Sequence, residues 1–265
     1  MERVFLPAED FRIGRVISRL FDVWFANLSV VTQLAVVLMS PMLAMSLYPL
    51  FLPQLAGMDA LEQMLPDAGG RYVLTAILNV VAYLIANYLL LASLAQLTVA
   101  YLGGERPGFT SCLSVALRSF FPLMLISILH LLGILLGVIL LLVPGFILMC
   151  MWIVVVPVRA IEGTSIMASF SRSRSLTEGH RGAVFLLILI FLAFALGLDL
   201  SVRPLMGVSI LSPQLGQITV GFTVAEWFEH VVAYTLAAML WASIYYELRL
   251  VKEGIGAQEM ATTFD

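Results

Sequence analysis

The chain has 265 residues, of which 61% are hydrophobic and only 12% are charged, and its formal net charge is −3. A soluble domain carries roughly 45–50% apolar and about 25% charged residues, so this chain has too little polar surface to coat a water-soluble globule of its size. The composition therefore excludes a cytosolic enzyme and indicates that the bilayer is the solvent for most of the chain.

The first predicted element is an amphipathic helix over residues 10–27. Arg12, Arg15 and Arg19 recur every three or four residues, and large apolar side chains fill most of the other positions. This is the period of a helix with one basic and one apolar face. Such a helix suits the headgroup plane of a membrane, with its apolar face entering the acyl boundary. We expect it to lie on the membrane and not to cross it.

Six apolar stretches follow and predict six transmembrane helices in a single membrane domain that covers residues 1–265. The spans are predicted at 28–50, 72–101, 120–143, 146–161, 182–200 and 222–246. A cytoplasmic tail is predicted at 247–265, and it begins with a mixed-charge helix exit that contains Glu247, Arg249, Lys252 and Glu253. The third and fourth spans are separated only by Pro144-Gly145, which indicates a tight helical hairpin. The Pro- and Gly-rich stretch 204–221 is too apolar for an ordinary wet loop, so we expect it to lie against the interface or to dip into it.

Lysine and arginine are distributed very unevenly over the segments between these spans. Twelve of the fourteen fall on one side of the membrane, and only Arg71 and Arg203 fall on the other. Because cytoplasmic loops are enriched in these residues, both termini are expected in the cytoplasm of a bacterial inner-membrane protein with several crossings. The cytoplasmic connections 109–120 and 164–179 also have helical character. The predicted fold class is thus an all-α integral membrane protein with amphipathic helices on its cytoplasmic side.

Polar side chains inside the spans are candidate functional groups because they are expensive in a bilayer. Asn79, Tyr83 and Asn87 follow one another at four-residue spacing, so they share one face of the second span. The stripe is interpreted either as interhelical hydrogen bonding or as part of a hydrophilic pathway. His130, near the middle of the third span, is interpreted either as a neutral imidazole bonded to another helix or as a ligand or proton relay.

The start of the sixth span carries Glu226, Glu229 and His230. Glu226 and His230 are one helical turn apart, a spacing that suits a divalent cation if another segment supplies further ligands. Acidic residues are also favoured in the first turn of a helix, and the chain has only three histidines. Glu226 and His230 are therefore weak metal candidates, and no metal or other cofactor is expected. An intramembrane lipid-modifying enzyme that uses Glu226, Glu229 and His230 is a minor hypothesis. Cys112 and Cys150 are expected to be inert thiols.

The cytoplasmic arginines are the predicted contacts to anionic lipid headgroups or to a protein partner. The residues proposed for this role are Arg12, Arg15, Arg19, Arg172, Arg174, Arg181 and Arg249. Each arginine near the headgroups is worth about 1 kcal/mol of attraction to an anionic leaflet, although a positive-inside anchor without any further role is the alternative. The basic residues are few and dispersed, so no nucleic-acid partner is expected.

Two of the cytoplasmic segments resemble a known family. One fits the pattern Ala-Leu-x-Arg-Ser-x-x-Leu-Thr-x-Gly through Phe170, Arg172, Ser173, Leu176, Thr177 and Gly179. The other fits Tyr-Tyr-x-x-Leu-Arg-x-x-Lys-Glu-Gly through Tyr245, Tyr246, Leu248, Arg249, Lys252, Glu253 and Gly254. Together with Ile13-Gly14-x-x-Ile17 and Pro144-Gly145, these segments resemble bacterial proteins similar to the membrane domain of glycerophosphoryl diester phosphodiesterase.

The resemblance covers nearly the whole chain, although Arg174 stands where the family usually has an aromatic residue and Ser169 where it usually has alanine. It implies a six-helix module, which in some members is joined to a separate catalytic domain. The chain shows no such domain, so the hydrolase activity is not carried over.

The leading hypothesis is a non-enzymatic inner-membrane module that binds lipid or a protein partner, or associates with copies of itself, as a scaffold or accessory subunit. The alternative is a small-molecule or ion transporter or channel that uses the polar faces of the second and third spans.

Overall fold

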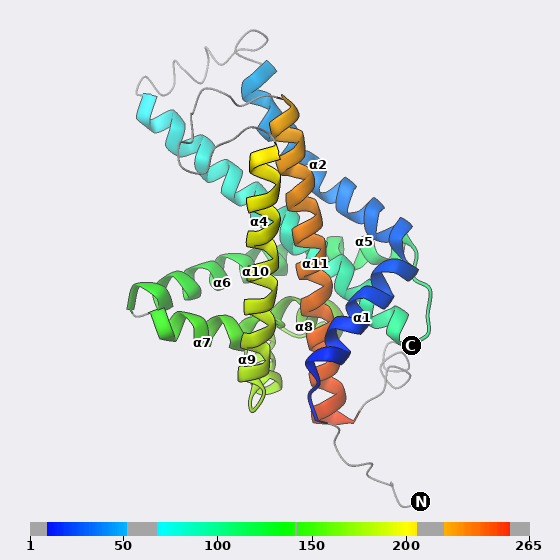
Figure 1. Cartoon of the computed structure of the whole chain (residues 1–265). Coiled ribbons are helices and arrows are strands. Elements are labelled where there is room, and N and C mark those ends of the chain that lie inside the picture. Colours follow the sequence, from blue (N-terminus) through cyan, green and yellow to red (C-terminus); the bar gives the residue numbers. More distant parts are fainter. Residues whose placement is uncertain (1–9, 52–67, 141, 206–219, 255–265) are drawn as a thin grey trace, which may run out of the picture.

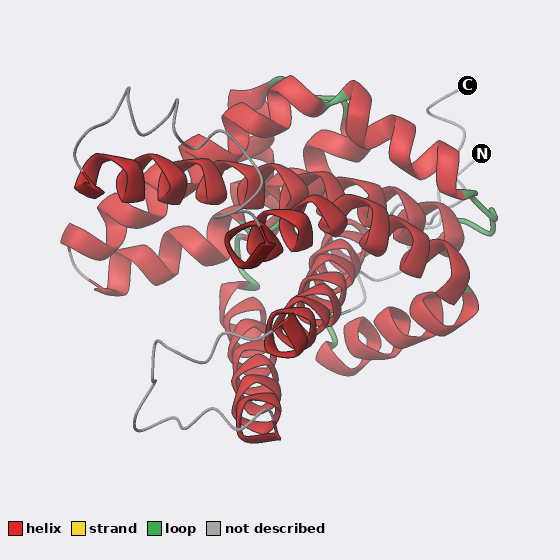
Figure 2. Cartoon of the chain, turned by 90° about the horizontal axis from the view of Figure 1, so that it is seen from above, coloured by secondary structure: helices red, strands yellow, loops and turns green. Residues whose placement is uncertain are grey.

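The computed structural model describes residues 10–51, 68–140, 142–205 and 220–254, and the regular structure in these ranges is entirely helical (Figure 2). In chain order the helices are α1 (Ile13–Ala26), α2 (Leu28–Phe51), α4 (Ala68–Leu102), α5 (Phe109–Arg118), α6 (Phe120–Leu140), α7 (Leu142–Trp152), α8 (Val155–Glu162), α9 (Ile166–Thr177), α10 (Arg181–Leu205) and α11 (Val220–Glu253).

Six segments of the described ranges are long and apolar enough to cross a membrane. They are Leu28–Leu47, Val80–Leu102, Phe120–Gly137, Val143–Glu162, Arg181–Pro204 and Val220–Glu253. Each overlaps one of the predicted spans. The prediction of an all-α membrane protein with six long apolar helices is therefore confirmed. The helix lengths and their apolar composition are those of a multi-pass membrane protein.

The core is centred on α11, which packs against α1, α2, α4 and α10. Leu90 and Leu94 of α4 and Met239 and Ile244 of α11 are fully buried. Figure 1 shows α10 and α11 running together along the length of the molecule. The beginning of α1 and the end of α11 lie at the same end of the molecule (Figure 1), which we call the basic end.

The predicted surface helix forms as α1, but its apolar face is shared between protein and surroundings. Val16, Leu20 and Val23 are buried against the bundle, whereas Phe21 and Phe25 remain exposed. Part of the apolar face that we expected to enter the acyl boundary therefore packs against the other helices of the protein instead. The other two predicted surface helices correspond to α5 and α9.

The fourth predicted span, 146–161, is not one helix but two, α7 and α8, separated at Ile153 and Val154. Pro157 explains the break, because a proline has no N–H to donate and its ring collides with the carbonyl four residues earlier, which here belongs to Ile153. The helix resumes where the Val158 amide donates to the Val154 carbonyl at 2.9 Å. The prediction of a continuous span was therefore wrong at this point.

The hairpin between the third and fourth apolar segments also differs from the prediction. Helix α6 ends at Leu140 and α7 already begins at Leu142, so Pro144 and Gly145 lie in the first turn of α7 instead of forming the turn. A proline is tolerated there, since the first amides of a helix have no intrahelical acceptor. Gly145 instead lets α6 come close: a Cβ built on Gly137 would lie 2.9 Å from the Gly145 Cα.

The segment predicted as a tail, 247–265, starts with the expected mixed-charge helix exit. Helix α11 continues to Glu253, because Glu247, Arg249 and Glu253 find ion-pair partners that keep them in the fold. The rest of the tail, and nearly all of the Pro- and Gly-rich stretch 204–221, lie outside the described residues.

Candidate functional site

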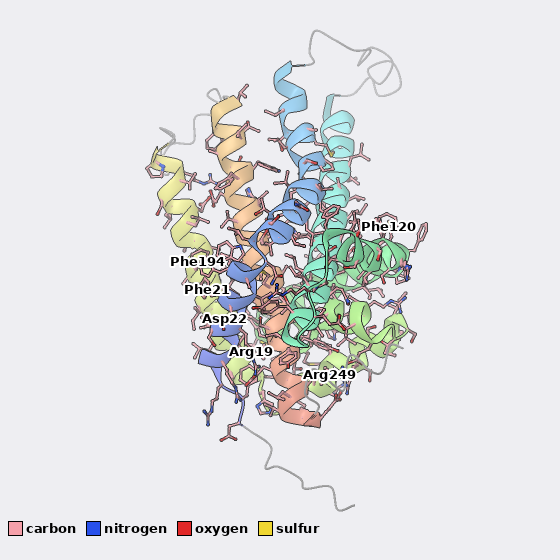
Figure 3. All side chains as sticks on the ribbon, turned by 90° about the vertical axis from the view of Figure 1, so that its right-hand side faces the viewer. Arg19, Phe21, Asp22, Phe120, Phe194 and Arg249 are labelled. Atoms are coloured by element: carbon pink, nitrogen blue, oxygen red, sulfur yellow. The ribbon has the colours of Figure 1, made fainter. Side chains whose placement is uncertain are left out.

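Eight side chains at the basic end form two groups of ion pairs and hydrogen bonds, which share helix α11 and which we together call the ionic layer. They come from α1, α8, α9 and α11 and are Arg15, Arg19, Glu162, Arg172, Tyr245, Glu247, Arg249 and Glu253. Figure 3 shows Arg19 on α1 and Arg249 on α11 toward this same end of the molecule.

Glu247 is the first centre of the ionic layer, and its side chain has no exposed surface. Arg15 lies 2.6 Å from its Oε1 through Nη2 and also donates from Nε at 2.8 Å. Arg19 pairs with Oε2, and the backbone amide of Arg12 donates to Oε1 at 3.3 Å. A buried carboxylate is tolerated only when it is paired and hydrogen-bonded in this way. The arrangement attaches α1 to α11.

Glu162 is the second centre and connects α8 to α9 and α11. It accepts a hydrogen bond from the Tyr245 hydroxyl at 2.9 Å and pairs with Arg172 at 3.1 Å. Glu253 pairs with Arg172 and accepts from Nε of Arg249 at 2.8 Å. Burial acts to lower the pKa of Arg172, but the hydrogen bonds to Glu162 and Glu253 raise that pKa above its ordinary value. The guanidinium is therefore held in its charged form between two carboxylates.

The turn between α8 and α9 places Glu162 and Arg172 beside each other. Gly163 adopts φ +63°, a left-handed conformation that glycine accepts without strain. Arg159 donates to the Gly163 carbonyl at 2.6 Å and also to the carbonyl of Thr164. Ser165 is the N-cap residue of α9, although its side chain makes no capping hydrogen bond. The chain thus reverses within three residues, and α9 runs back along α8.

The seven arginines predicted to contact lipid or a partner fall into three groups. Arg15, Arg19, Arg172 and Arg249 belong to the ionic layer. The side chains of Arg12 and Arg174 are exposed. Arg181 is half-buried, and its Nε is enclosed without a hydrogen-bond partner. The exposed pair is therefore the part of the predicted set that is open to an external anion.

The polar stripe of α4 makes contact with α11. The rings of Tyr83 and Tyr234 meet edge to face, with their centroids 5.4 Å apart. His230 stacks on the other side of this group, with its ring 5.6 Å from that of Tyr234. The side chain of Asn79 lies outside the described part of the chain. Sequence reasoning missed Tyr234, although it stands one helical turn after His230.

His130 belongs to a different cluster. Its Nδ1 lies 2.8 Å from the Tyr88 hydroxyl, and its ring meets Trp152 edge to face at 6.1 Å. Its Nε2 is buried without a hydrogen-bond partner. Tyr88 follows Asn87 directly in the sequence but lies on another face of α4, which is why the stripe and His130 take different partners. Tyr88 was also missed from sequence, since nothing in its spacing marks it.

A pocket of about 250 Å³ opens beside the polar stripe. It is lined by Met42, Met45, Ser46, Val80, Ala82 and Tyr83. Of the stripe residues whose side chains the structure describes, Tyr83 lines the pocket, and the other lining residues are mostly apolar. The pocket thus offers a mainly apolar space with two hydroxyl-bearing side chains, Ser46 and Tyr83, in its wall.

The weak metal candidates do not face a common point. Nδ1 of His230 lies 2.7 Å from the backbone carbonyl of Glu226, and the Glu226 carboxylate is 3.8 Å from Arg203. Arg203 in turn donates to Asp199 at 2.6 Å. Glu229 is buried. Within the described ranges no group of three or more His, Cys, Asp or Glu side chains is placed to hold a metal ion.

Comparison of the chain with protein-family models, curated proteins and solved structures found no match. The resemblance to the glycerophosphoryl diester phosphodiesterase membrane domain therefore stays a prediction, and the function is argued below from the geometry of this chain alone.

Proposed function

We propose that the chain is a non-enzymatic membrane module that binds anionic lipid or a protein partner at its basic end and acts as a scaffold or accessory subunit. The observation that carries the proposal is that the polar groups within the apolar helices turn toward one another. Tyr83 packs its ring edge to face against Tyr234, while His130 bonds with Tyr88 in a separate cluster. A catalytic site or a pathway needs several polar groups around one shared space.

The ionic layer supports a scaffold role because it ties four helices together at one end. The fully buried Glu247 attaches α1 to α11 through two arginines. Arg12 and Arg174 lie at the start of α1 and in the last turn of α9, with their side chains exposed. Such a framework presents cations at fixed positions, and fixed donors bind an anionic headgroup with less loss of conformational entropy than mobile ones.

The test is to compare bound anionic lipid in the purified protein and in Arg12→Gln/Arg174→Gln by native mass spectrometry. Each arginine contributes about 1 kcal/mol to attraction by an anionic leaflet, so the double variant should bind anionic lipid roughly 30-fold more weakly. Partner proteins that copurify are measured in the same preparations.

Glu178→Gln is the matched control, because Glu178 is exposed at the end of α9 but carries the opposite charge. This variant should keep the bound lipid. If the double variant retains lipid and copurifying proteins at the level of the unchanged chain, a binding role for these cations is contradicted.

The transporter or channel alternative is favoured by one observation, the pocket of about 250 Å³ that Tyr83 borders. The transporter or channel hypothesis predicts that a transported solute occupies this pocket. Ser46→Trp places a large side chain in the pocket, so this variant should abolish uptake of the solute into proteoliposomes. Retained uptake in this variant, or no uptake by the unchanged chain, argues against the alternative.

A further inference from the structure

The hairpin formed by α6 and α7 runs across the molecule. In Figure 1, α10 and α11 run along the long axis, whereas α6 and α7 extend sideways from it at the middle and lower levels of α11. The two helices pack mainly on each other, and beyond that on α4, α5, α8, α9 and α10. The hairpin therefore does not run parallel to the helices that form the main bundle.

The charge distribution of the sequence assigns the connections at which the two arms of the hairpin start and finish to the same, basic side of the membrane. Helix α6 follows α5, whose last residue is Arg118, and α7 is followed by α8, whose last residue, Glu162, belongs to the ionic layer. At 1.5 Å per residue the 11 residues of α7 reach only about 16 Å, roughly half of a hydrocarbon core of about 30 Å. The break at Pro157 prevents α8 from extending α7 in line.

The surface of the hairpin is apolar on all of its open sides. No Asp, Glu, Lys or Arg occurs between Arg118 and Arg159. Near the tip, Ile139 is 70% exposed and Val143 is 67% exposed. Leu132, Leu136 and Ile147 are also exposed. Contiguous apolar surface of this kind is not stable in water, so the hairpin lies among acyl chains.

Glycines keep the hairpin thin. A Cβ on Gly133 would lie 2.2 Å from the Trp152 ring, and one on Gly137 would lie 2.9 Å from the Gly145 backbone. Small residues let helices approach closely in lipid, where van der Waals packing drives association. The hairpin is thus a flat, closely packed pair of helices.

We propose that α6 and α7 form an intramembrane hairpin that is embedded in the leaflet at the basic end and does not cross the bilayer. Its partner is the acyl chains of that single leaflet. The crosswise direction, the short α7 and the apolar tip support this position, and the charge distribution assigns both connections to the basic side. The hairpin then occupies area in one leaflet only and acts as a wedge beside the spanning helices. This inference stands independently of the binding role proposed above.

The test uses single cysteines in a Cys112→Ala/Cys150→Ala background and a maleimide that does not cross membranes. Ile139→Cys and Val143→Cys probe the tip of the hairpin. Both side chains are exposed, so replacing them leaves the packing between the helices intact. Ser111→Cys in α5 marks the basic side and Val220→Cys at the start of α11 marks the opposite side. In sealed vesicles of both orientations each marker should react from one side. The tip cysteines should react from neither side, and only after denaturation in dodecyl sulfate.

A spin label at the same tip positions measures how deep the tip of the hairpin lies in the bilayer. Accessibility to oxygen should exceed accessibility to a water-soluble nickel chelate, and the depth should fall in the leaflet of the Ser111 marker. Maleimide labelling from the Val220 side, or a depth in the opposite leaflet, means that the hairpin crosses and overturns the proposal. Labelling from the Ser111 side means that the hairpin lies outside the membrane and also overturns it.

Discussion

Glu247 is the side chain on which the attachment of α1 depends. It has no exposed surface and is the common partner of Arg15 and Arg19, whose side chains are only 23% and 18% exposed. Arg19 also lies over the ring of Tyr246, with Cζ 4.9 Å from the centroid. Both cations therefore share Glu247 as a partner, Arg15 also donates to the Asp10 carbonyl at 2.8 Å, and Arg19 has an aromatic face beside it.

Replacing this carboxylate should be strongly destabilising. Glu247→Gln removes the carboxylate charge that pairs with the guanidinium groups of both Arg15 and Arg19, and breaking a buried pair by removing one partner costs about 3 kcal/mol or more. We expect a lower midpoint of thermal unfolding in detergent. Asp22→Asn, at an exposed position of the same helix α1, should change stability by less than about 0.5 kcal/mol. Equal midpoints for the two variants would refute the role given to Glu247.

Cys112 is predicted to be unreactive in the folded protein at pH 8. Burial raises the pKa of this thiol to about 11, and the residue has no exposed surface. Since the thiolate is the reactive form, iodoacetamide should modify it only after denaturation. Ser111→Cys in a Cys112→Ala/Cys150→Ala background is the control, because position 111 is exposed on the same helix, and it should react quickly.

The pH dependence of stability follows from the same thiol. The raised pKa means that the folded state holds the proton more firmly than the unfolded state. The stabilisation from Cys112 is therefore complete below the ordinary thiol pKa, and it declines as the pH rises toward 11. Cys112→Ala should remove this part of the alkaline decline in thermal midpoint. If the thermal midpoint of Cys112→Ala falls at alkaline pH as much as that of the unchanged chain, the decline is caused by other titratable groups.

At the scale of elements, the hairpin of α6 and α7 depends on the absence of side chains at its contact. Gly137→Ala places a Cβ 2.9 Å from the backbone of Gly145, and backbone cannot move aside as a flexible side chain does. Overpacking of this kind costs about 1–3 kcal/mol, so the thermal midpoint in detergent should fall. Gly197→Ala in α10 has nothing within 4 Å of the new Cβ and should gain up to about 1 kcal/mol from helix propensity. A midpoint for Gly137→Ala at or above that of the unchanged chain would contradict the close contact.

The extent of most elements could be predicted from sequence, and the exceptions have identifiable causes. The amphipathic period of α1 and the long apolar runs of α2, α4, α10 and α11 leave little choice, because a bilayer admits only backbone that is hydrogen-bonded within the segment. The division of the fourth apolar segment depends on the collision between Pro157 and the carbonyl of Ile153. The early start of α7 goes together with a close approach of Gly137 to Gly145, a contact between helices that neither segment shows alone.

At the scale of the whole molecule, charge is handled differently on the two sides. At the basic end, carboxylates from α8 and α11 pair with arginines from α1, α9 and α11. At the other end, Arg203 pairs with Asp199 and lies 3.8 Å from Glu226. The apolar length between them contains two separate polar clusters, around Tyr83 and around His130. The ion pairs named here thus lie toward the two ends, with the two polar clusters between them.

The arginines illustrate what sequence leaves open. Arg12, Arg15, Arg19, Arg172 and Arg174 were assigned a single role because they share one charge and one side of the membrane. The structure separates the paired members from the exposed ones, since pairing requires carboxylates that are up to 232 positions away in the chain, as Glu247 is from Arg15. Spacing along one helix cannot reveal a partner on another.

Composition, hydropathy and charge order by themselves determined that this is an all-helical membrane protein with six long apolar segments, because the solvent of each segment follows from its own side chains. The tertiary structure alone decided which polar groups meet, which arginines remain exposed, and that α6 and α7 lie across the bundle. These features depend on contacts between segments and on the direction of one helix relative to another. A local hydrophobic pattern does not reveal that direction, because it is the same for a helix that crosses a bilayer and for one that lies within a single leaflet.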